Sequence, residues 1–431
     1  MDLITKAPKG TYDIMPPESV VWQTIEHVMR SVAACNGFQE IRTPVFEHTE
    51  LFLRGVGDTT DVVEKQMYTF EDKGGRSITL RPEGTAGAVR AMPESGIYNQ
   101  GYPLKLFYAA TCYRYEKPQA GRLREFRQFG VELFGAKSPA ADAQVITLGT
   151  SIFNWLGLKN VQLHINSIGC KECRKDYHKA LKDYFTARKD KLCASCLSRL
   201  DRNPMRILDC KSPVCREIAA SAPIVSDYLC EDCRSHYTAL KDYLTAAGVD
   251  FIQNDKLVRG LDYYTGTVFE YVSTEIGAQG AIGGGGRYDN LVEEFGGNPT
   301  AGLGFGLGMD RILLLMKAQN NTHLSSDLPD LFVASIGEKA DKAAFLLVNR
   351  AHEISLWAEC ELCGRGLKAQ LKYANKIQAK FTIVLGDTEI KNGEAVLKNM
   401  KTGEKHLISL GKAFEEELIT VITSAEDLAF I

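Results

Sequence analysis

One short peptide, RGLDYYTGTVFE, sets a guanidinium ahead of two adjacent phenols and a β-prone run. The guanidinium is that of Arg259, and the phenols are those of Tyr263 and Tyr264. A guanidinium stabilises negative charge on a phosphate, and a phenol can donate or accept a hydrogen bond. A strand that served packing alone would not carry this order of groups. The peptide therefore indicates a small, polar and charged ligand.

Two strand patterns, residues 105–116 and 126–134, flank the polar segment KPQAGRLRE. Side chains alternate along a strand, so each pattern carries one polar face: Arg114 and Glu116 on the first, and Phe126, Gln128 and Glu132 on the second. If the two faces coincide, they suit an anionic phosphate, a stacked base and a cationic amine held together. A solvated face with incidental ion pairs is the alternative. The opposite face of the second strand is already apolar, which weighs against that alternative.

Glycine occupies every second position in AGLGFGLGMDR, from Gly302 to Gly308. In a strand, this spacing clears one face of side chains, so that a flat ligand could lie directly on the backbone. Arg311 follows near the start of a predicted helix, where the helix dipole and its own charge both favour phosphate. Close packing of another layer against glycine is the alternative. The run GGGG at 283–286 likewise suggests a close approach to the backbone.

The whole chain has the composition of an ordinary soluble protein. It has 431 residues, 45% hydrophobic and 24% charged, with a formal net charge of −3. This length favours two or more domains, and the charge excludes a globally basic nucleic-acid binder. The N-terminal segment has no apolar run typical of a signal peptide, and no apolar block is long enough to span a membrane. We therefore expect a cytoplasmic protein whose cysteines are reduced.

Hydrophobic periodicity and glycine or proline breaks predict the elements that position these groups. Helices are expected after Pro17, from Thr85 and over 309–318, and a cysteine-rich, mostly helical segment over roughly 165–250. The best linker by composition is QNNTHLSSDLPD, residues 319–330. Beyond it, LFVASIG and FTIVLG read as strands of a small α/β domain. Further strands are expected at 38–46, 77–80 and 257–272.

Several of these motifs resemble a known family. The strand–loop–strand with Arg114, and the glycine strand before Arg311, resemble motifs 2 and 3 of class II aminoacyl-tRNA synthetases, while Pro44 resembles the motif 1 proline. RGLDYYTGTVFE and GGGGRYDNL look like signature peptides of the histidyl-tRNA synthetases, and LRPEGTAGAVR and PKGTYDIMPPES are also similar. This resemblance covers essentially the whole chain. It implies an α+β fold: an antiparallel-sheet catalytic domain over 1–322 with a helical insertion at about 170–250, and an anticodon-binding α/β domain over 328–431.

The resemblance also implies a two-step reaction. Histidine and ATP form histidyl-adenylate and pyrophosphate, and histidine tRNA then receives the histidyl group with release of AMP. Magnesium would accompany ATP. A homodimer is implied as well, because the motif 1 strand and its helix form the subunit contact in the family.

The resemblance assigns roles to particular side chains. Arg259 and Arg114 would be catalytic, on the α-phosphate. The ATP-binding set would be Arg114, Glu116, Phe126 and Arg311. The histidine-binding set would be Glu83, Gly84, Thr85, Gln128, Glu132, Tyr263 and Tyr264. Within it, Glu83, Thr85 and Gln128 would receive the α-ammonium, and Glu132 and Tyr264 the imidazole.

Eight cysteines lie between residues 170 and 233, in four pairs: Cys170-x2-Cys173, Cys193-x2-Cys196, Cys210-x4-Cys215 and Cys230-x2-Cys233. In a reducing compartment this spacing indicates zinc, with enough thiols for two four-cysteine sites. The resemblance makes any such zinc structural and places the insertion against the acceptor arm of the tRNA. The alternative is that helices supply the fold and the thiols hold no metal. Cys360-x2-Cys363 has no second pair and is not expected to bind metal.

The C-terminal segment GRGLKAQLKYANKIQAK predicts a helix with a stripe of like charge. Lys368, Lys372, Lys376 and Lys380 recur at i, i+4 spacing, and the apolar residues turn elsewhere. A solvated face is the usual explanation of one such stripe. Here the segment resembles an anticodon-binding domain, which favours contact with tRNA phosphates.

Three other functions are open on the sequence. The first is a regulatory paralogue that binds histidine to control a phosphoribosyltransferase, which would be expected to lose the ATP arginines or the C-terminal domain. The second is an RNA-binding module, like the synthetase-like part of a stress kinase. The third is a synthetase for glycine, threonine or proline, against which the tyrosine-pair peptide argues.

Overall fold

The computed structural model describes residues 5–57, 60, 62–277, 280–322 and 328–427. The chain divides into two compact units, Met1–Leu324 and Ser325–Ile431. Part of the segment predicted as a linker, residues 323–327, lies outside the described residues. Among the described residues, every helix is too short or too polar to cross a lipid bilayer.

An eight-stranded mixed sheet forms the centre of the first unit, with the order β1-β5-β6-β11-β10-β9-β7-β8. The two outer pairs, β1 with β5 and β7 with β8, are parallel, and the inner strands are antiparallel. The strands are β1 (Gln39–Glu40), β5 (Leu104–Tyr113), β6 (Glu125–Phe134), β7 (Gln162–Ser167), β8 (Ile252–Gln253), β9 (Thr265–Val272), β10 (Ala281–Arg287) and β11 (Gly302–Gly308).

Three long helices bury one face of this sheet: α1 (Glu18–Cys35), α4 (Pro139–Trp155) and α10 (Met309–Ala318). In strands β6 and β11, every second side chain is apolar and points to this side of the sheet. Phe129 and Phe305 pack there with ring centroids 6.5 Å apart. The start of α3 and the end of α10 lie where the sequence pattern predicts them. The other face of the sheet carries a second hydrophobic core, with Leu106 and Val268, and the polar groups of the site lie beside it.

That second face is bordered by smaller elements. Helix α3 (Thr85–Ser95) and the short helix α9 (Leu291–Glu294) pack together, and α2 (Thr49–Val56) packs against both. A separate three-stranded sheet has the order β2-β4-β3, with β2 (Phe46–His48), β3 (Tyr68–Glu71) and β4 (Ser77–Leu80). Strand β4 lies where the sequence predicts it.

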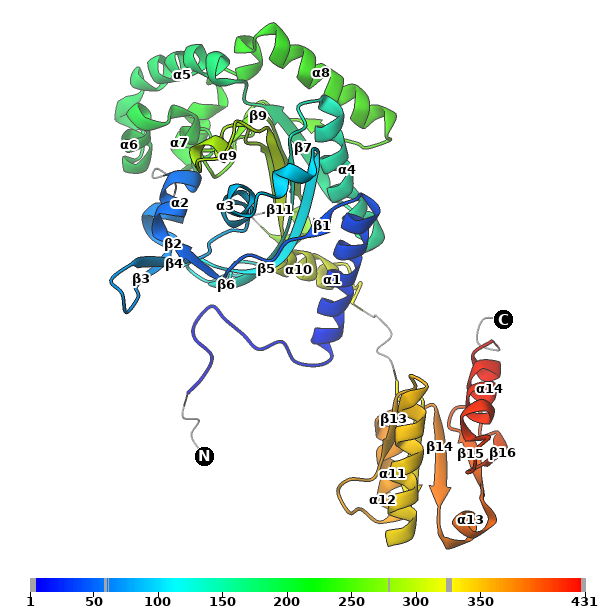
Figure 1. Ribbon diagram of the computed structural model, residues 1–431. Coiled ribbons are helices and arrows are strands. Elements are labelled where there is room, and N and C mark those ends of the chain that lie inside the picture. Colours follow the sequence, from blue (N-terminus) through cyan, green and yellow to red (C-terminus); the bar gives the residue numbers. More distant parts are fainter. Residues whose placement is uncertain (1–4, 58–59, 61, 278–279, 323–327, 428–431) are drawn as a thin grey trace. The chain divides into compact units, whose positions relative to one another are not determined.

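A helical insertion separates β7 from β8 and is grouped on one side of the unit, in green in Figure 1. Its helices are α5 (Lys171–Thr186), α6 (Ala194–Arg202), α7 (Pro213–Ala220) and α8 (Glu231–Ala246). Helix α8 packs against α4, and a short 3-10 turn, Pro204–Ile207, packs against α5 and α6.

Three predicted strands are shorter in the structure. The strand expected at 257–272 begins only at Thr265, so Arg259–Tyr264 is a loop. Side chains of the insertion, rather than a neighbouring strand, bond the carbonyls of Arg259 and Tyr264. The segment 38–46 pairs as a strand only at its two ends. Between them, the carbonyls of Thr43 and Pro44 accept hydrogen bonds from the Arg81 side chain instead of from a neighbouring strand. The first hairpin strand stops at Tyr113, short of Arg114 and Glu116.

The second unit is a five-stranded sheet with helices on both faces. Its strand order is β13-β12-β14-β15-β16. Leu331 and Ile383 belong to one hydrophobic core, and Phe332 and Ala334 to another, so alternate residues of β12 face opposite layers. The elements are β12 (Leu331–Ser335), α11 (Glu338–Glu353), β13 (Ala358–Cys360), α12 (Leu367–Lys376), β14 (Phe381–Leu385), α13 (Asp387–Asn392), β15 (Glu394–Asn399), β16 (Lys405–Ser409) and α14 (Phe414–Asp427).

The lysine stripe is shorter than predicted. Lys368, Lys372 and Lys376 are exposed on α12, but the helix ends at Lys376 and Gln378 adopts a left-handed φ of 55°. Lys380 lies beyond this break, and its Nζ is 2.8 Å from Asp330 Oδ1. The helix therefore presents three lysines, and its apolar residues pack against the sheet as expected.

Candidate active site

An open cleft of about 470 Å³ lies on the polar face of the first unit. Six of the residues predicted to bind or activate ligands line it together: Arg114, Glu116, Phe126, Gln128, Arg259 and Arg311. They come from the β5–β6 hairpin, the loop before β9 and the start of α10. Segments almost 200 residues apart in sequence thus meet in one cavity, as the family resemblance implies.

One end of this cleft, formed by Arg114, Arg122, Phe126 and Arg311 and called its outer end below, is rich in positive charge. Arg114 donates to the Pro82 carbonyl at 2.8 Å, and its guanidinium lies 5.2 Å from the centre of the Phe126 ring. Arg311 donates to the carbonyls of Gly121 and Ala281. Burial lowers the pKa of Arg311, and the cation of Arg122 acts in the same direction. Clustered guanidinium groups beside an aromatic ring suit a nucleotide polyphosphate.

Arg259 lies deeper, against an acidic partner. Its Nη1 is 2.5 Å from Glu270 Oε1 on β9. Burial acts to lower the pKa of Arg259, but the charge of Glu270 outweighs it and the pKa is raised. A Cβ at Gly284 would lie 2.9 Å from the same Nη1. The glycine run of β10 therefore makes room for this guanidinium.

The predicted ammonium-binding residues gather at the start of α3. Glu83 is buried and accepts hydrogen bonds of 2.7 Å from the backbone N–H groups of both Thr85 and Ala86. Burial raises the pKa of Glu83 against these donors. Gln128 Oε1 accepts from Gly84 N at 3.0 Å, which joins this helix start to the inner end of the cleft.

Glu132 is completely buried among phenols. Tyr108 donates to one carboxylate oxygen at 3.3 Å, and Tyr288 donates to the other. Burial raises the pKa of Glu132 to about 8, although the Tyr288 hydrogen bond acts to lower it. A Cβ at Gly304 would fall 2.0 Å from Glu132 Oε2, so only glycine fits beside this carboxyl group.

The two adjacent tyrosines complete the buried cluster. The rings of Tyr263 and Tyr264 are 4.6 Å apart, and Tyr263 lies edge-on to Tyr288 at 5.7 Å. Burial raises the pKa of both phenols, and the charges of Glu83 and Glu132 add to the rise. The structure thus brings the predicted histidine-binding residues together, but Glu83, Glu132 and both tyrosines are buried beyond the open cleft.

The glycine strand serves this cluster differently from the prediction. Along β11, the missing side chains leave room for Tyr288 at Gly302, for Glu132 at Gly304 and for Gln128 at Gly306. Only Gly306 and Gly308 line the open cleft. The cleared face therefore holds the protein's own polar side chains over most of its length, rather than a bare backbone floor.

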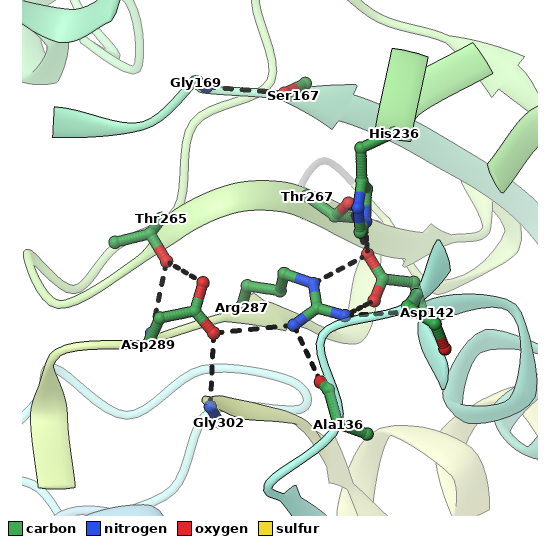
Figure 2. Close-up of polar contacts among 11 residues, drawn as sticks. Ala136, Asp142, Ser167, Gly169, His236, Thr265, Thr267, Arg287, Asp289 and Gly302 are labelled. Atoms are coloured by element: carbon green, nitrogen blue, oxygen red, sulfur yellow. Dashed lines mark hydrogen bonds and ion pairs between the residues drawn. The ribbon is translucent and has the colours of Figure 1, made fainter. Parts of the chain in front are cut away.

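A buried ionic network behind the site was missed on the sequence. Figure 2 shows Arg287 between Asp142 of α4 and Asp289, with further bonds to backbone carbonyls. Asp289 in turn accepts from Thr265 Oγ1 and Gly302 N. This network fixes both chain neighbours of Tyr288, the donor to Glu132. The sequence feature that could have indicated this network is the glycine run that precedes Arg287 and Tyr288.

The insertion holds two clusters of four thiols, and all twelve cysteines of the chain are free thiols. The outer cluster is Cys170, Cys173, Cys230 and Cys233, and the inner cluster is Cys193, Cys196, Cys210 and Cys215. Within each cluster, the sulfur atoms all lie within 4.8 Å of one another. Such a set could bind a metal ion. The pair Cys360 and Cys363 belongs to neither cluster.

Comparison with known proteins gives a consistent result. Residues 10–312 match the family described as histidyl-tRNA synthetase, and residues 330–418 match the anticodon binding domain. A histidine–tRNA ligase of Caldanaerobacter subterraneus is 52% identical over 403 residues, covering 94% of this chain and 97% of that protein. One of Acetivibrio thermocellus is 53% identical, covering 95% and 98%.

The chain belongs to the histidyl-tRNA synthetase family. Apo histidyl-tRNA synthetase of S. aureus aligns with a TM-score of 0.82 at 39% identity, covering 96% of this chain and all of that one. The resemblance read from the signature peptides is therefore confirmed, and so is the predicted class II catalytic fold with an anticodon-binding domain. The histidyl-tRNA synthetase signature peptides supply Arg259 at the cleft and Tyr263, Tyr264 and Tyr288 in the buried cluster.

Proposed function

We propose that this protein attaches histidine to histidine tRNA through a histidyl-adenylate, with release of pyrophosphate and then AMP. The observation that supports this most is the layout of one cavity. Arg114, Arg259 and Arg311 line a cleft whose inner end adjoins a buried set of carboxyl groups and phenols. The cationic end suits ATP, and the acid–phenol end suits an amino acid with an imidazole.

In the first step, the histidine carboxylate attacks the α-phosphorus and the bond to the β-phosphate breaks. Arg259 and Arg114 bind the α-phosphate and stabilise the charge that develops on its oxygens. Phe126 stacks on the adenine, Glu116 holds the adenine or its ribose, and Arg311 meets the γ-phosphate. The glycine-lined end of the cleft leaves space for these groups.

The amino acid is bound by the buried cluster. Glu83, Thr85 and Gln128 receive the α-ammonium, since a cation removed from water needs hydrogen-bond acceptors. Glu132 and Tyr264 bind the two imidazole nitrogens, and Tyr263 forms the pocket wall. Glu132 already accepts from two phenols, so an imidazole N–H takes the place of one of them.

In the second step, a hydroxyl of the terminal adenosine of the tRNA attacks the histidyl carbonyl carbon, and AMP leaves. We place the anticodon stem on the C-terminal unit, where Lys368, Lys372 and Lys376 present a cationic helix face. We further propose a homodimer, which sedimentation at micromolar concentration would contradict by giving the mass of one chain. The enzyme is placed in the cytoplasm, where ribosomes use charged tRNA and thiols stay reduced.

Two kinds of metal complete the proposal. Magnesium would accompany the triphosphate, and the carboxylate of Glu270, which lines the cleft, could help to hold it. Zinc occupies the two cysteine clusters of the insertion as a structural ion, because four thiolates form the closed coordination typical of structural zinc. Neither zinc site lies among the residues that line the cleft.

Pyrophosphate exchange tests the assignment of the substrate. Exchange should require ATP, magnesium and histidine, and should not occur with glycine, threonine or proline. The Arg259→Ala variant, purified in the same way, controls for a host synthetase that co-purifies. Exchange with one of the other three amino acids and not with histidine contradicts the proposal. Histidine binding without any exchange would favour the regulatory paralogue instead.

A further inference from the structure

The insertion holds the loop of residues 259–264 in place. Arg206 Nη1 donates to the Arg259 carbonyl at 2.9 Å, and Arg174 Nη1 donates to the Tyr264 carbonyl at 3.1 Å. Between them, Asn203 Nδ2 donates to Asp262 Oδ1 at 2.9 Å. Because β9 begins only at Thr265, these bonds replace the strand pairing that would otherwise fix this backbone. Both ends of the loop thus depend on another part of the chain.

Each of these three donors comes from a segment bounded by cysteines. Arg174 directly follows Cys173 of the outer cluster. Asn203 and Arg206 lie between Cys196 and Cys210 of the inner cluster, on the turn that follows α6. The positions of the donors are therefore linked to those of the two clusters.

The geometry of both clusters fits zinc. Thiolates at the corners of a zinc tetrahedron lie about 3.8 Å apart, from a Zn–S distance of about 2.3 Å. The Sγ atoms of Cys170 and Cys173 are 3.5 Å apart, and those of Cys193 and Cys210 are 3.8 Å apart. Backbone N–H groups donate to cluster sulfurs, from Cys230 to Cys173 Sγ at 3.1 Å and from Cys193 to Cys215 Sγ at 3.3 Å. Hydrogen bonds of this kind orient thiolate ligands and stabilise their negative charge around a metal ion.

The helices around the inner cluster are too short to hold this geometry alone. Helix α6 has nine residues and α7 has eight, below the length at which isolated helices are stable in water. The outer cluster ties the start of α5 to the start of α8, which closes the insertion at its base. Two metal ions would fix both helix pairs in addition to the buried apolar core of the insertion, which includes Phe185 and Ile207.

The base of the insertion also touches the sheet beside the loop. Ile168 N donates to the Gly266 carbonyl at 2.7 Å, and Gly266 N donates to the Gly169 carbonyl at 3.0 Å. These bonds join the residues just before Cys170 to those just after Tyr264. The outer cluster is thus connected to the loop by two short routes, through the backbone and through Arg174.

We infer that zinc bound at the two cysteine clusters sets the geometry of the loop 259–264, with Arg174, Asn203 and Arg206 as positioning residues. This inference rests on the proposed function only in naming the loop's ligand as histidine. Its consequence is that the insertion controls amino-acid activation, a step that takes place before tRNA binds. An insertion that served tRNA contact alone would leave that step unchanged.

Metal analysis and hydrogen–deuterium exchange test the zinc part without any assay of activity. The purified full-length chain should hold two zinc ions, and Cys230→Ser and Cys196→Ser should each lose one. In both variants, amide exchange in residues 259–266 should become faster, while exchange in the C-terminal unit stays unchanged. A chain that takes up no zinc when it is refolded with the metal under reducing conditions overturns the inference. Zinc loss without faster exchange in 259–266 overturns it as well.

The positioning part is tested with the zinc still bound. Arg174→Met should raise the KM for histidine about threefold to tenfold, the effect of one lost hydrogen bond. Its KM for ATP should change by less than about twofold, and Arg174→Lys, which keeps a donor, should recover most of the loss. Arg216→Met, an exposed change in the same insertion, is the matched control. All values refer to the active fraction, obtained from the burst of adenylate formation.

The outcomes separate this inference from the proposed function. If histidine is not activated by the zinc-loaded protein, the proposed function fails while the metal and exchange results still stand. If Arg174→Met lowers only the active fraction and leaves the KM for histidine unchanged, the residue merely supports folding and the positioning role is wrong. If only the KM for tRNA changes, the insertion acts in the second step and the inference is wrong.

Discussion

The two ends of the active site are built in opposite ways. At the outer end, Arg114, Arg122 and Arg311 line an open cleft together with Phe126. At the inner end, Glu83, Glu132, Tyr263 and Tyr264 are each buried, with at most 8% of their surface exposed. The outer end is mostly cationic and open to solvent, whereas the inner end is a buried cluster of acids and phenols.

This difference suggests that charge at the outer end provides affinity, and that the fixed shape of the inner end provides selectivity. Guanidinium groups in an open cleft can bind any polyphosphate, so we expect the outer end to give affinity for nucleotide with limited selectivity. A buried carboxyl group with fixed phenols selects strongly, because a ligand without the matching N–H leaves polar groups unpaired. Arg259 lines the cleft and is also close enough to Tyr264 for the two to interact, so we propose that the reacting atoms of both substrates meet there.

Arg259→Ala should have the largest effect, because it removes the charge at that junction. We expect the kcat of pyrophosphate exchange with histidine to fall by about 10²- to 10³-fold, the usual result of deleting one group that stabilises transition-state charge. The KM for histidine should change little. Arg122→Ala is the matched control, since Arg122 also lines the cleft but pairs with Glu116 at 3.0 Å. Equal losses in the two variants would show that net charge matters rather than position.

Glu132→Gln should weaken the binding of histidine at the inner end, while it removes the loss of folding stability that a buried carboxylate causes at high pH. The variant keeps the shape but replaces one of the two acceptor oxygens with an NH2 donor and removes the charge, so kcat/KM for histidine should fall by roughly 30-fold to 100-fold. Exchange rates over a range of histidine concentrations give this value. Tyr243→Phe, an exposed change on α8, is a control that should leave it unaltered.

The same variant tests the raised pKa of Glu132. Since the folded-state pKa is about 8 and lies above that of the unfolded chain, the folded state binds the extra proton. The free energy of unfolding should then fall as the pH rises from about 4.5 to about 8, by on the order of 2–3 kcal/mol between pH 6 and pH 9. Glu132→Gln should lack this loss in urea titrations at the two pH values. A parallel decline in both proteins would contradict the assignment to Glu132.

Phe126→Ala should weaken the outer end by less. Stacking of a base on one aromatic ring contributes about 1–3 kcal/mol, so the KM for ATP should rise about tenfold. The KM for histidine should stay within about twofold of its original value, because Phe126 does not touch the buried cluster. Phe126→Tyr keeps the ring and should restore binding. An equal rise in both constants would show that the hairpin itself had been distorted.

Elements whose signal is local were predictable from the sequence. Alternation along β6 places Gln128 and Glu132 on one face, and the ladder pairs their neighbours with β5 and β11 as the pattern requires. Glycine at every second position marked β11 as the strand beside the site. Thr85 and Met309 begin helices where composition places them.

Features that depend on distant partners were not predictable in this way. The β-prone residues before Thr265 suggested a longer strand, but their backbone partners are Arg174 and Arg206, which lie in the insertion. The bond from Tyr288 to Glu132 follows from the order of β6, β11 and β10 in the sheet, which no local pattern contains. The cysteine spacing does not show which of the four pairs share a cluster, so the nested arrangement of the two clusters also required the fold.

The lysines of α12 offer the smallest and most selective test, because they should affect neither end of the active site. Lys372→Ala should raise the KM for tRNA by about twofold to threefold at low salt, and the difference should shrink as salt rises, since a phosphate contact releases counterions. Lys380→Ala is the matched control, because Lys380 pairs with Asp330 beyond the end of the helix. Pyrophosphate exchange should be unchanged in both variants. A change in exchange would mean that the C-terminal unit influences adenylate formation, and the division of labour between the cleft and the tRNA-binding face would then be wrong.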